Sequence, residues 1–126
     1  MIRYNWVHIS DRRGRIVVPM GKVMSLQSAL FYQFEVCPTS ANELKDSLFG
    51  AIATVIVFAD SEKLGRCRSC RFITRNHWRI EKCMRVMAVC PQQLERFDTA
   101  VRKVYRQAEL YGIAACFDGW KKHPHK

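Results

Sequence analysis

Residues 51–59 read Ala-Ile-Ala-Thr-Val-Ile-Val-Phe-Ala, and this stretch decides the fold. It is the longest apolar run in the chain, and it is rich in β-branched residues, which favour strands. A run of this length is typical of a buried strand and falls well short of the roughly 20 residues that cross a bilayer. Because polar residues do not alternate with apolar ones, both faces of the strand should be buried. The stretch therefore predicts the central strand of a sheet.

Weaker patterns on either side of this run predict the remaining elements. Strands are expected at 5–9 and 15–18, around a turn at 11–14, and at 31–36 and 113–117. Ser40 and Glu43 form a capping-box pattern that predicts a helix ending at Gly50, and an earlier helix is expected from Lys22 to about Leu30. Apolar residues spaced three and four apart predict helices over about 76–90 and 92–111. The expected fold is α+β, with a small, mostly antiparallel sheet, about four helices, a long C-terminal amphipathic helix and a cysteine-rich basic centre.

Length and composition indicate one domain over residues 1–126. Of the 126 residues, 48% are hydrophobic, which supplies one compact core and excludes disorder over the whole length. No run is long enough for a membrane span, and the first residues lack the pattern of a secretory signal. We therefore expect a cytoplasmic protein without a membrane partner.

Positive charge is concentrated in one segment. The chain carries 21 Lys and Arg against 11 Asp and Glu, a formal net charge of +10. Residues 61–85 hold eight basic and two acidic residues, a net charge of +6. If this segment is helical, spacings of 3, 4, 4 and 3 form a ridge of Arg68, Arg71, Arg75, Arg79 and Lys82. Phosphates would neutralise such a ridge, and an aromatic ring among arginines can stack on a base. The predicted contacts with nucleic acid in this segment are therefore the ridge together with Arg66 and Trp78.

The cysteines suggest a structural metal site. Cys67 and Cys70 form a C-x2-C pair, Cys83 follows, and His77 or Cys90 would complete four tetrahedral ligands. We expect zinc at this site, with reduced structural cysteines, or an iron–sulfur or redox role, as the alternatives. Cys37 and Cys116 lie in apolar surroundings and are expected to be small buried residues.

Two short motifs resemble known families. The stretch Asp11-Arg-Arg-Gly-Arg-Ile-Val-Val-Pro19, with Leu26 seven residues later, resembles the start of the AbrB-type swapped-hairpin DNA-binding domain. The resemblance implies that Arg12, Arg13 and Arg15 would face DNA. Cys37-Pro-Thr-Ser40 is similar to the C-P-x-S site of glutaredoxin-like proteins, in which a helix N-terminus makes the thiol nucleophilic.

Catalytic patterns are scarce. The carboxylates are scattered and no glycine-rich phosphate loop is present, so we do not expect an enzyme. The leading hypothesis is a small basic regulatory protein that binds DNA or RNA and is stabilised by zinc. The alternative is a non-enzymatic interaction or inhibitor protein, of the phage or plasmid accessory type, that docks on an acidic or nucleic-acid-binding surface of a partner protein.

Overall fold

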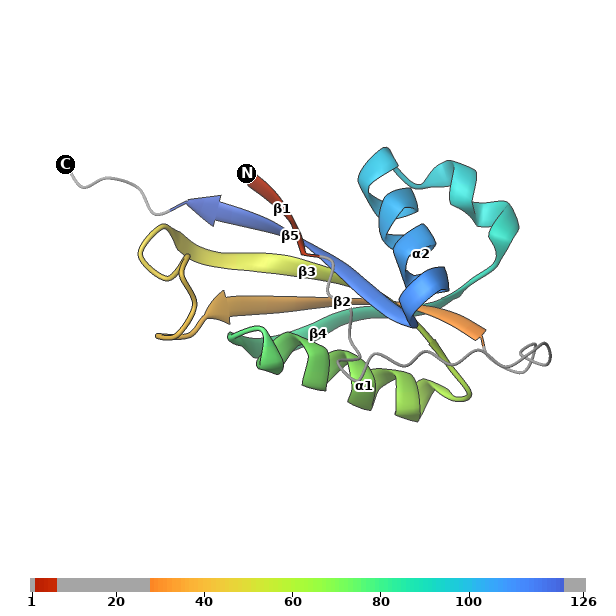
Figure 1. Cartoon of the computed structure of the whole chain (residues 1–126), viewed down its shortest axis with the longest axis horizontal. Coiled ribbons are helices and arrows are strands. Elements are labelled where there is room, and N and C mark those ends of the chain that lie inside the picture. Colours follow the sequence, from red (N-terminus) through yellow and green to blue (C-terminus); the bar gives the residue numbers. More distant parts are fainter. Residues whose placement is uncertain (1, 7–27, 122–126) are drawn as a thin grey trace.

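A five-stranded antiparallel sheet organises the protein. The computed structural model describes residues 2–6 and 28–121. The strands lie in the order β1-β5-β3-β2-β4 (Figure 1), and every neighbouring pair is antiparallel. The elements along the chain are β1 (Ile2–Trp6), β2 (Ser28–Pro38), β3 (Leu48–Ala59), α1 (Glu62–Arg75), β4 (Trp78–Val89), the 3₁₀ helix η2 (Pro91–Arg96), α2 (Thr99–Tyr111) and β5 (Ile113–Lys121).

Strand β3 occupies the centre of the sheet, as residues 51–59 predict. It pairs with β2 on one side and with β5 on the other. Ala53, Val55, Ile56 and Val57 are fully buried. A strand covered on both faces needs apolar residues at successive positions, so the prediction of a central strand is confirmed.

The two α-helices cover opposite faces of the sheet (Figure 1). On one face, Phe72 and Ile73 of α1 pack in a cluster with Val55 and Val57 of β3. On the other face, Val104, Tyr105 and Ala108 of α2 join a cluster that includes Ile56. Alternate residues of β3 therefore supply two separate cores, one beneath each helix.

Helix α1 lies unusually close to the sheet at Gly65. The helix begins after Ser61, whose hydroxyl accepts a hydrogen bond from the Leu64 N–H at 3.1 Å. A Cβ at Gly65 would lie 2.8 Å from Leu30 Cδ1 and 2.9 Å from the Tyr32 hydroxyl oxygen. That hydroxyl donates to the Glu62 carbonyl at 2.6 Å. These contacts fix the helix on the sheet, and with it the side chains on its outer surface.

Strand β4 replaces the helix expected over about 76–90, and that expectation is wrong. Tyr32, Phe34 and Val36 of β2 lie two residues apart, but they face Val86, Cys83 and Ile80, which lie three apart. Two register shifts, between Gln33 and Phe34 and between Glu35 and Val36, cause this mismatch. Each bulge adds one residue to β4, so its inward-facing residues acquire a spacing that resembles a helical period.

The prediction of a long C-terminal helix is also wrong, and so is the expected fold class. Residues 91–96 form η2, and Asp98 begins α2 by accepting a hydrogen bond from the Val101 N–H at 3.0 Å. Gly112, with φ of 92°, ends the helix, which is 13 residues long and leads directly into β5. The described residues thus contain two α-helices and one 3₁₀ helix rather than about four helices.

Turns take the place of the helix expected after Ser40. The Asn42 side chain accepts a hydrogen bond from the Leu44 N–H at 2.8 Å, a local bond that competes with helix formation. The expected helix over 22–30 is also corrected, because residues 28–30 open β2. Residues 7–27 lie outside the described residues, and so do Arg12, Arg13, Arg15 and the AbrB-like motif. Within the ranges described, no helix is long and apolar enough to cross a membrane.

Candidate nucleic-acid interface

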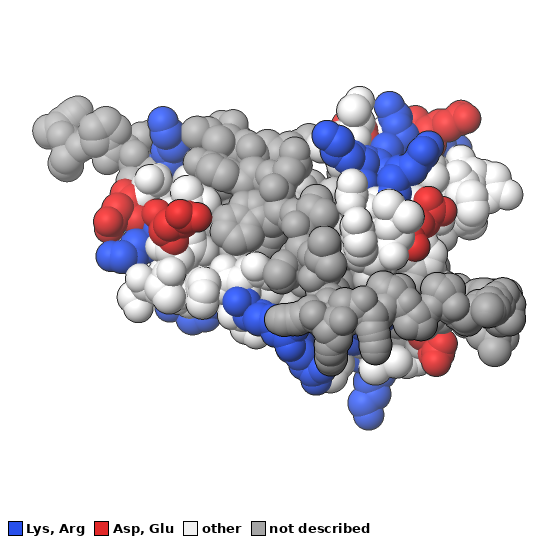
Figure 2. Space-filling model, viewed as in Figure 1, with Lys and Arg blue, Asp and Glu red and all other residues white. Residues whose placement is uncertain are grey.

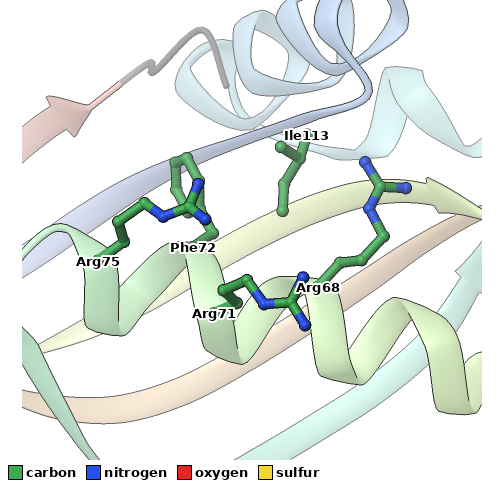
Figure 3. Close-up of a pocket in the computed structure, with 5 residues that line it drawn as sticks. All are labelled: Arg68, Arg71, Phe72, Arg75 and Ile113. Atoms are coloured by element: carbon green, nitrogen blue, oxygen red, sulfur yellow. The ribbon is translucent and has the colours of Figure 1, made fainter. Parts of the chain in front are cut away.

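Three arginines share one side of α1. Arg68, Arg71 and Arg75 lie at positions i, i+3 and i+7, and they line a shallow pocket together with Phe72 and Ile113 (Figure 3). The pocket has a volume of about 120 Å³. We call these three residues the arginine row. The predicted ridge was conditional on a helix, and these three positions are helical.

Arg68 anchors the row to the sheet. Its Nη1 donates to the Phe58 carbonyl at 2.6 Å, and its Nη2 would lie 3.1 Å from a Cβ at Gly112. Burial lowers the pKa of Arg68, and the neighbouring charge of Arg71 lowers it further. A guanidinium remains charged at neutral pH, so this side chain is a partly desolvated cation beside a second cation. An anion in the pocket would relieve both effects.

The arginine row forms no ion pair within the described structure, although the charge of Asp60 acts on Arg68 and partly offsets the lowering of its pKa. None of its three guanidinium groups forms an ion pair with a carboxylate of residues 28–121. Helix α1 carries Lys63, Arg66 and the row, five basic residues, against Glu62 alone, which gives a net charge of +4. Figure 2 shows blue side chains along the lower edge of the molecule, where Figure 1 places α1. Within the described residues, the positive charge of this helix is therefore not neutralised by ion pairs and can attract an anion.

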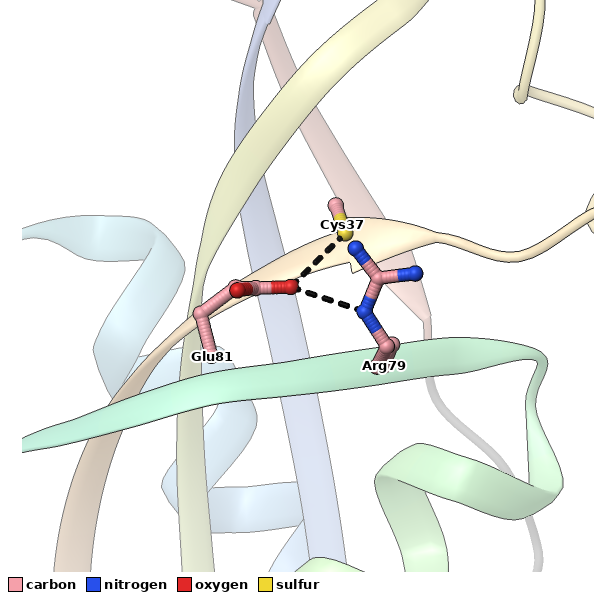
Figure 4. A network of polar contacts seen from close by, with 3 residues as sticks. All are labelled: Cys37, Arg79 and Glu81. Carbon is pink, nitrogen blue, oxygen red and sulfur yellow. Dashed lines mark hydrogen bonds and ion pairs between the residues drawn. The ribbon is translucent and has the colours of Figure 1, made fainter.

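The predicted ridge does not continue beyond α1. The helix ends at Arg75, and Arg79 and Lys82 belong to β4. The Arg79 Nε lies 2.8 Å from a Glu81 carboxylate oxygen, which also accepts a hydrogen bond from the Cys37 thiol at 3.1 Å (Figure 4). Arg79 is therefore engaged by a carboxylate of its own chain, and Lys82 is exposed on the edge strand.

Two other residues predicted to contact nucleic acid, Trp78 and Arg66, do not belong to the arginine row. Trp78 is 1% exposed, and its ring stacks on Phe117 with centroids 4.6 Å apart. It belongs to the core and offers no free face to a base, which corrects its expected role. Arg66 is exposed on α1. Burial raises the pKa of the nearby Cys70, and the charge of Arg66 offsets part of this increase.

The cysteines are not gathered as the ligands of one metal. Cys67 and Cys70 lie on α1, and Cys70 and Cys83 both pack against the first core cluster. His77 follows the C-terminal end of α1, and Cys90 precedes η2 at the other end of β4. Across residues 28–121, no three His, Cys, Asp or Glu side chains are grouped as a metal site. Zinc stays a prediction that rests on the spacing of the cysteines.

The environment of Cys37 differs from that of a reactive thiol. No helix begins at Ser40, so the thiol lacks the helix N-terminus that the glutaredoxin-like motif implies. Burial raises the pKa of Cys37, and its hydrogen bond to Glu81 raises it further. Both effects favour the neutral thiol. Cys116 is fully buried, as its apolar neighbours predict.

A second pocket adjoins the arginine row and was not predicted from the sequence. It has a volume of about 300 Å³ and is lined by Ala41, Asn42, Glu43, Arg75, Asn76 and His77. Its walls come from the β2–β3 connection and the α1–β4 turn, which are about 35 residues apart in sequence. The sequence offered no signal for this pocket, because Asn76 and His77 were expected at the start of a helix over about 76–90, whereas they follow the end of α1. Arg75 lines both pockets.

Comparison of the chain with protein-family models, with curated proteins and with solved structures gives no match. The functional argument therefore rests on the geometry and charge of the two pockets.

Proposed function

We propose that this protein binds nucleic acid and that the arginine row holds the phosphate backbone. The observation that carries the proposal is the pocket lined by Arg68, Arg71 and Arg75, whose guanidinium groups follow one side of α1 and form no ion pair with a carboxylate of the described residues. Phosphate oxygens accept paired hydrogen bonds from the planar guanidinium fork, which makes arginine well suited to this partner.

The dimensions of the row also favour a polymer of phosphates. Seven residues separate Arg68 from Arg75, a rise of about 10 Å along the helix axis. One strand of a duplex carries about three phosphates over that distance. A chain of phosphates can therefore follow the row, whereas a single carboxylate would neutralise only one part of it.

The surface of α2 is a weaker candidate. It carries Arg102, Lys103 and Arg106 against Glu109, a net charge of +2. Arg102 donates to the Phe97 carbonyl at 2.7 Å. In Figure 2, red side chains lie among the blue ones in the region where Figure 1 places α2 and η2. Lys103 and Arg106 are exposed, so they serve as matched controls for the row.

The test compares two double variants by fluorescence anisotropy with a labelled oligonucleotide. Arg71→Gln/Arg75→Gln should weaken binding at least about tenfold, because two charge-assisted hydrogen-bonding groups are lost. Lys103→Gln/Arg106→Gln removes the same net charge from the opposite face and should change affinity much less. Matching thermal unfolding curves would show that both variants fold. Equal losses from the two variants would refute a specific role for the row.

An acidic protein surface is the competing partner. Two results together would favour this alternative over nucleic-acid binding. The protein would bind a partner protein from which nucleic acid has been removed, and it would show no measurable affinity for oligonucleotides.

A further inference from the structure

The second pocket combines groups that differ from those of the arginine row. Glu43 supplies a carboxylate, His77 an imidazole and Asn76 an amide, while Arg75 connects the pocket to the row. A volume of about 300 Å³ reaches the lower end of the range for pockets that hold small organic ligands. The pocket is therefore large enough for a planar heterocycle whose phosphate lies at Arg75.

The backbone of His77 is held in an uncommon conformation. Its φ is 70°, in the left-handed region that a non-glycine residue rarely adopts. Its carbonyl accepts three hydrogen bonds, from Thr39 N at 3.0 Å, Thr39 Oγ1 at 3.1 Å and Asn42 Nδ2 at 2.9 Å. These bonds connect the α1–β4 turn to the β2–β3 connection and fix the backbone from which the exposed side chain of His77 extends. A histidine ring in such a place can stack on a base.

Glu43 gives the pocket a specific chemical preference. It is exposed, and within the described residues it forms no ion pair. A carboxylate only accepts hydrogen bonds, so it binds best to a ligand edge that carries two donors. Among the bases, guanine presents two adjacent donors on its Watson–Crick edge, N1–H and the N2 amino group. Adenine places an acceptor beside its amino group and would leave one carboxylate oxygen opposite a lone pair.

Asn76 adds a second acceptor. Its Nδ2 donates one N–H to the Phe72 carbonyl at 2.8 Å, so Oδ1 remains as an acceptor and the second N–H as a donor. The side chain of Asn42 is fully used within the protein, because Nδ2 bonds to His77 and Oδ1 accepts from Leu44. The Glu43 carboxylate and Asn76 Oδ1 are therefore two acceptors in a pocket wall that also contains the cation Arg75.

We propose that this pocket binds an unpaired guanine of a single-stranded nucleic acid, with Glu43 at its Watson–Crick edge, His77 against its ring and its phosphate at Arg75. The inference rests on the proposed function, since the arginine row holds the strand. The guanine must be unpaired because base pairing would occupy the same edge.

The experiment measures affinities of short oligomers of uridine that contain one central guanosine, adenosine or inosine. The wild-type protein should prefer guanosine to adenosine by about tenfold, the scale of one good bidentate contact. Inosine lacks the N2 amino group and should bind with intermediate affinity. Glu43→Gln should abolish most of this preference, whereas Glu95→Gln, at an exposed glutamate of η2, should preserve it.

Matched deoxyribonucleotides and free GMP identify the source of the guanine. A similar preference in RNA and DNA supports recognition through the base edge alone, and a larger preference in RNA supports it with an added contact to the 2′-hydroxyl. A preference confined to free GMP would overturn the assignment to a strand.

The inference and the proposed function fail in different ways. Equal affinity for guanosine and adenosine oligomers, or a preference that survives in Glu43→Gln, would overturn the guanine pocket. If Arg71→Gln/Arg75→Gln still weakens every oligomer, the proposed function stands without it. If that variant binds every oligomer as the wild type does, the proposed function itself is refuted.

Discussion

Replacement of Gly65 by alanine tests how α1 is positioned, because this glycine marks the closest approach of the helix to the sheet. The new methyl group would lie 2.8 Å from Leu30 Cδ1 and 2.9 Å from the Tyr32 hydroxyl oxygen. Tyr32 is fully buried and its hydroxyl donates to the Glu62 carbonyl, and Leu30 is buried in the same core cluster, so both neighbours are confined by packing. Overpacking of this kind costs about 1–3 kcal/mol.

Two further contributions set the expected net effect. Alanine favours a helix over glycine by about 1 kcal/mol, whereas loss of the Tyr32 hydrogen bond costs about 0.5–1.5 kcal/mol. Gly65→Ala should therefore lower the free energy of unfolding by about 0.5–3.5 kcal/mol, although propensity alone predicts a gain. Urea denaturation monitored by circular dichroism measures this change.

A control and a double variant make the result specific. Lys63→Ala, at an exposed position of the same helix, should change stability by less than about 0.5 kcal/mol. Leu30→Val/Gly65→Ala should lose less stability than the sum of the single variants, because the shorter side chain makes room for the methyl group. A Gly65→Ala protein as stable as the wild type, or more stable, would refute the close approach of α1.

Three further predictions concern other parts of the fold. Asn42→Ala should lower the free energy of unfolding by about 1–3 kcal/mol, because Asn42 is 2% exposed and the substitution removes one hydrogen bond to the His77 carbonyl. Thermal unfolding measures this change, and an unchanged melting temperature would contradict a stabilising role for Asn42. Cys37 should react with iodoacetamide at pH 8 more slowly than the exposed Cys67, because the raised pKa of Cys37 leaves less thiolate. A mass-spectrometric time course measures both rates, and faster labelling of Cys37 would contradict the geometry of Figure 4. If zinc is bound, elemental analysis should find one equivalent of zinc in the wild-type protein, and Cys67→Ser should lose the metal and stability. A metal-free wild-type protein, together with a Cys67→Ser variant as stable as the wild type, would refute the zinc prediction.

The sequence was informative where one physical rule acted alone. Residues 51–59 are apolar at successive positions because both faces of β3 are covered, and few other chain environments produce that pattern. The spacing of Arg68, Arg71 and Arg75 likewise follows from a regular helix. The start of that helix is less distinct in the sequence: residues 60–65 are polar enough to indicate a loop, but Ser61 caps a helix that begins at Glu62.

Strand β4 was misread because two bulges changed its period. The helix was predicted from Ile80, Met84 and Met87, which are four and three residues apart. In the strand, Met84 lies at a bulge and is 47% exposed, and Ile80 and Met87 pack in different core clusters. A bulge depends on the pairing with β2 and leaves no distinct mark in a single sequence. Because this segment was expected to be helical, the predicted arginine ridge continued past Arg75, and Trp78 was given a role in base stacking that requires an exposed ring.

The second pocket could not be predicted because it depends on contacts between distant segments. Asn42 and His77 are 35 residues apart, and their hydrogen bond brings Glu43 near the end of α1. Each residue alone is typical of an ordinary turn. Only the tertiary structure combines a carboxylate, an imidazole and an arginine in one cavity.

The salt dependence of oligonucleotide binding tests the central claim most directly. Arg71 and Arg75 are exposed, and each phosphate that is neutralised on a single strand contributes about 0.7 to the slope of log affinity against log salt concentration. The wild-type protein should therefore show a slope of about −1.4 or steeper, and Arg71→Gln/Arg75→Gln should reduce its magnitude by about 1.4. A flat dependence for the wild type, or an identical slope for the two proteins, would contradict phosphate binding by the arginine row.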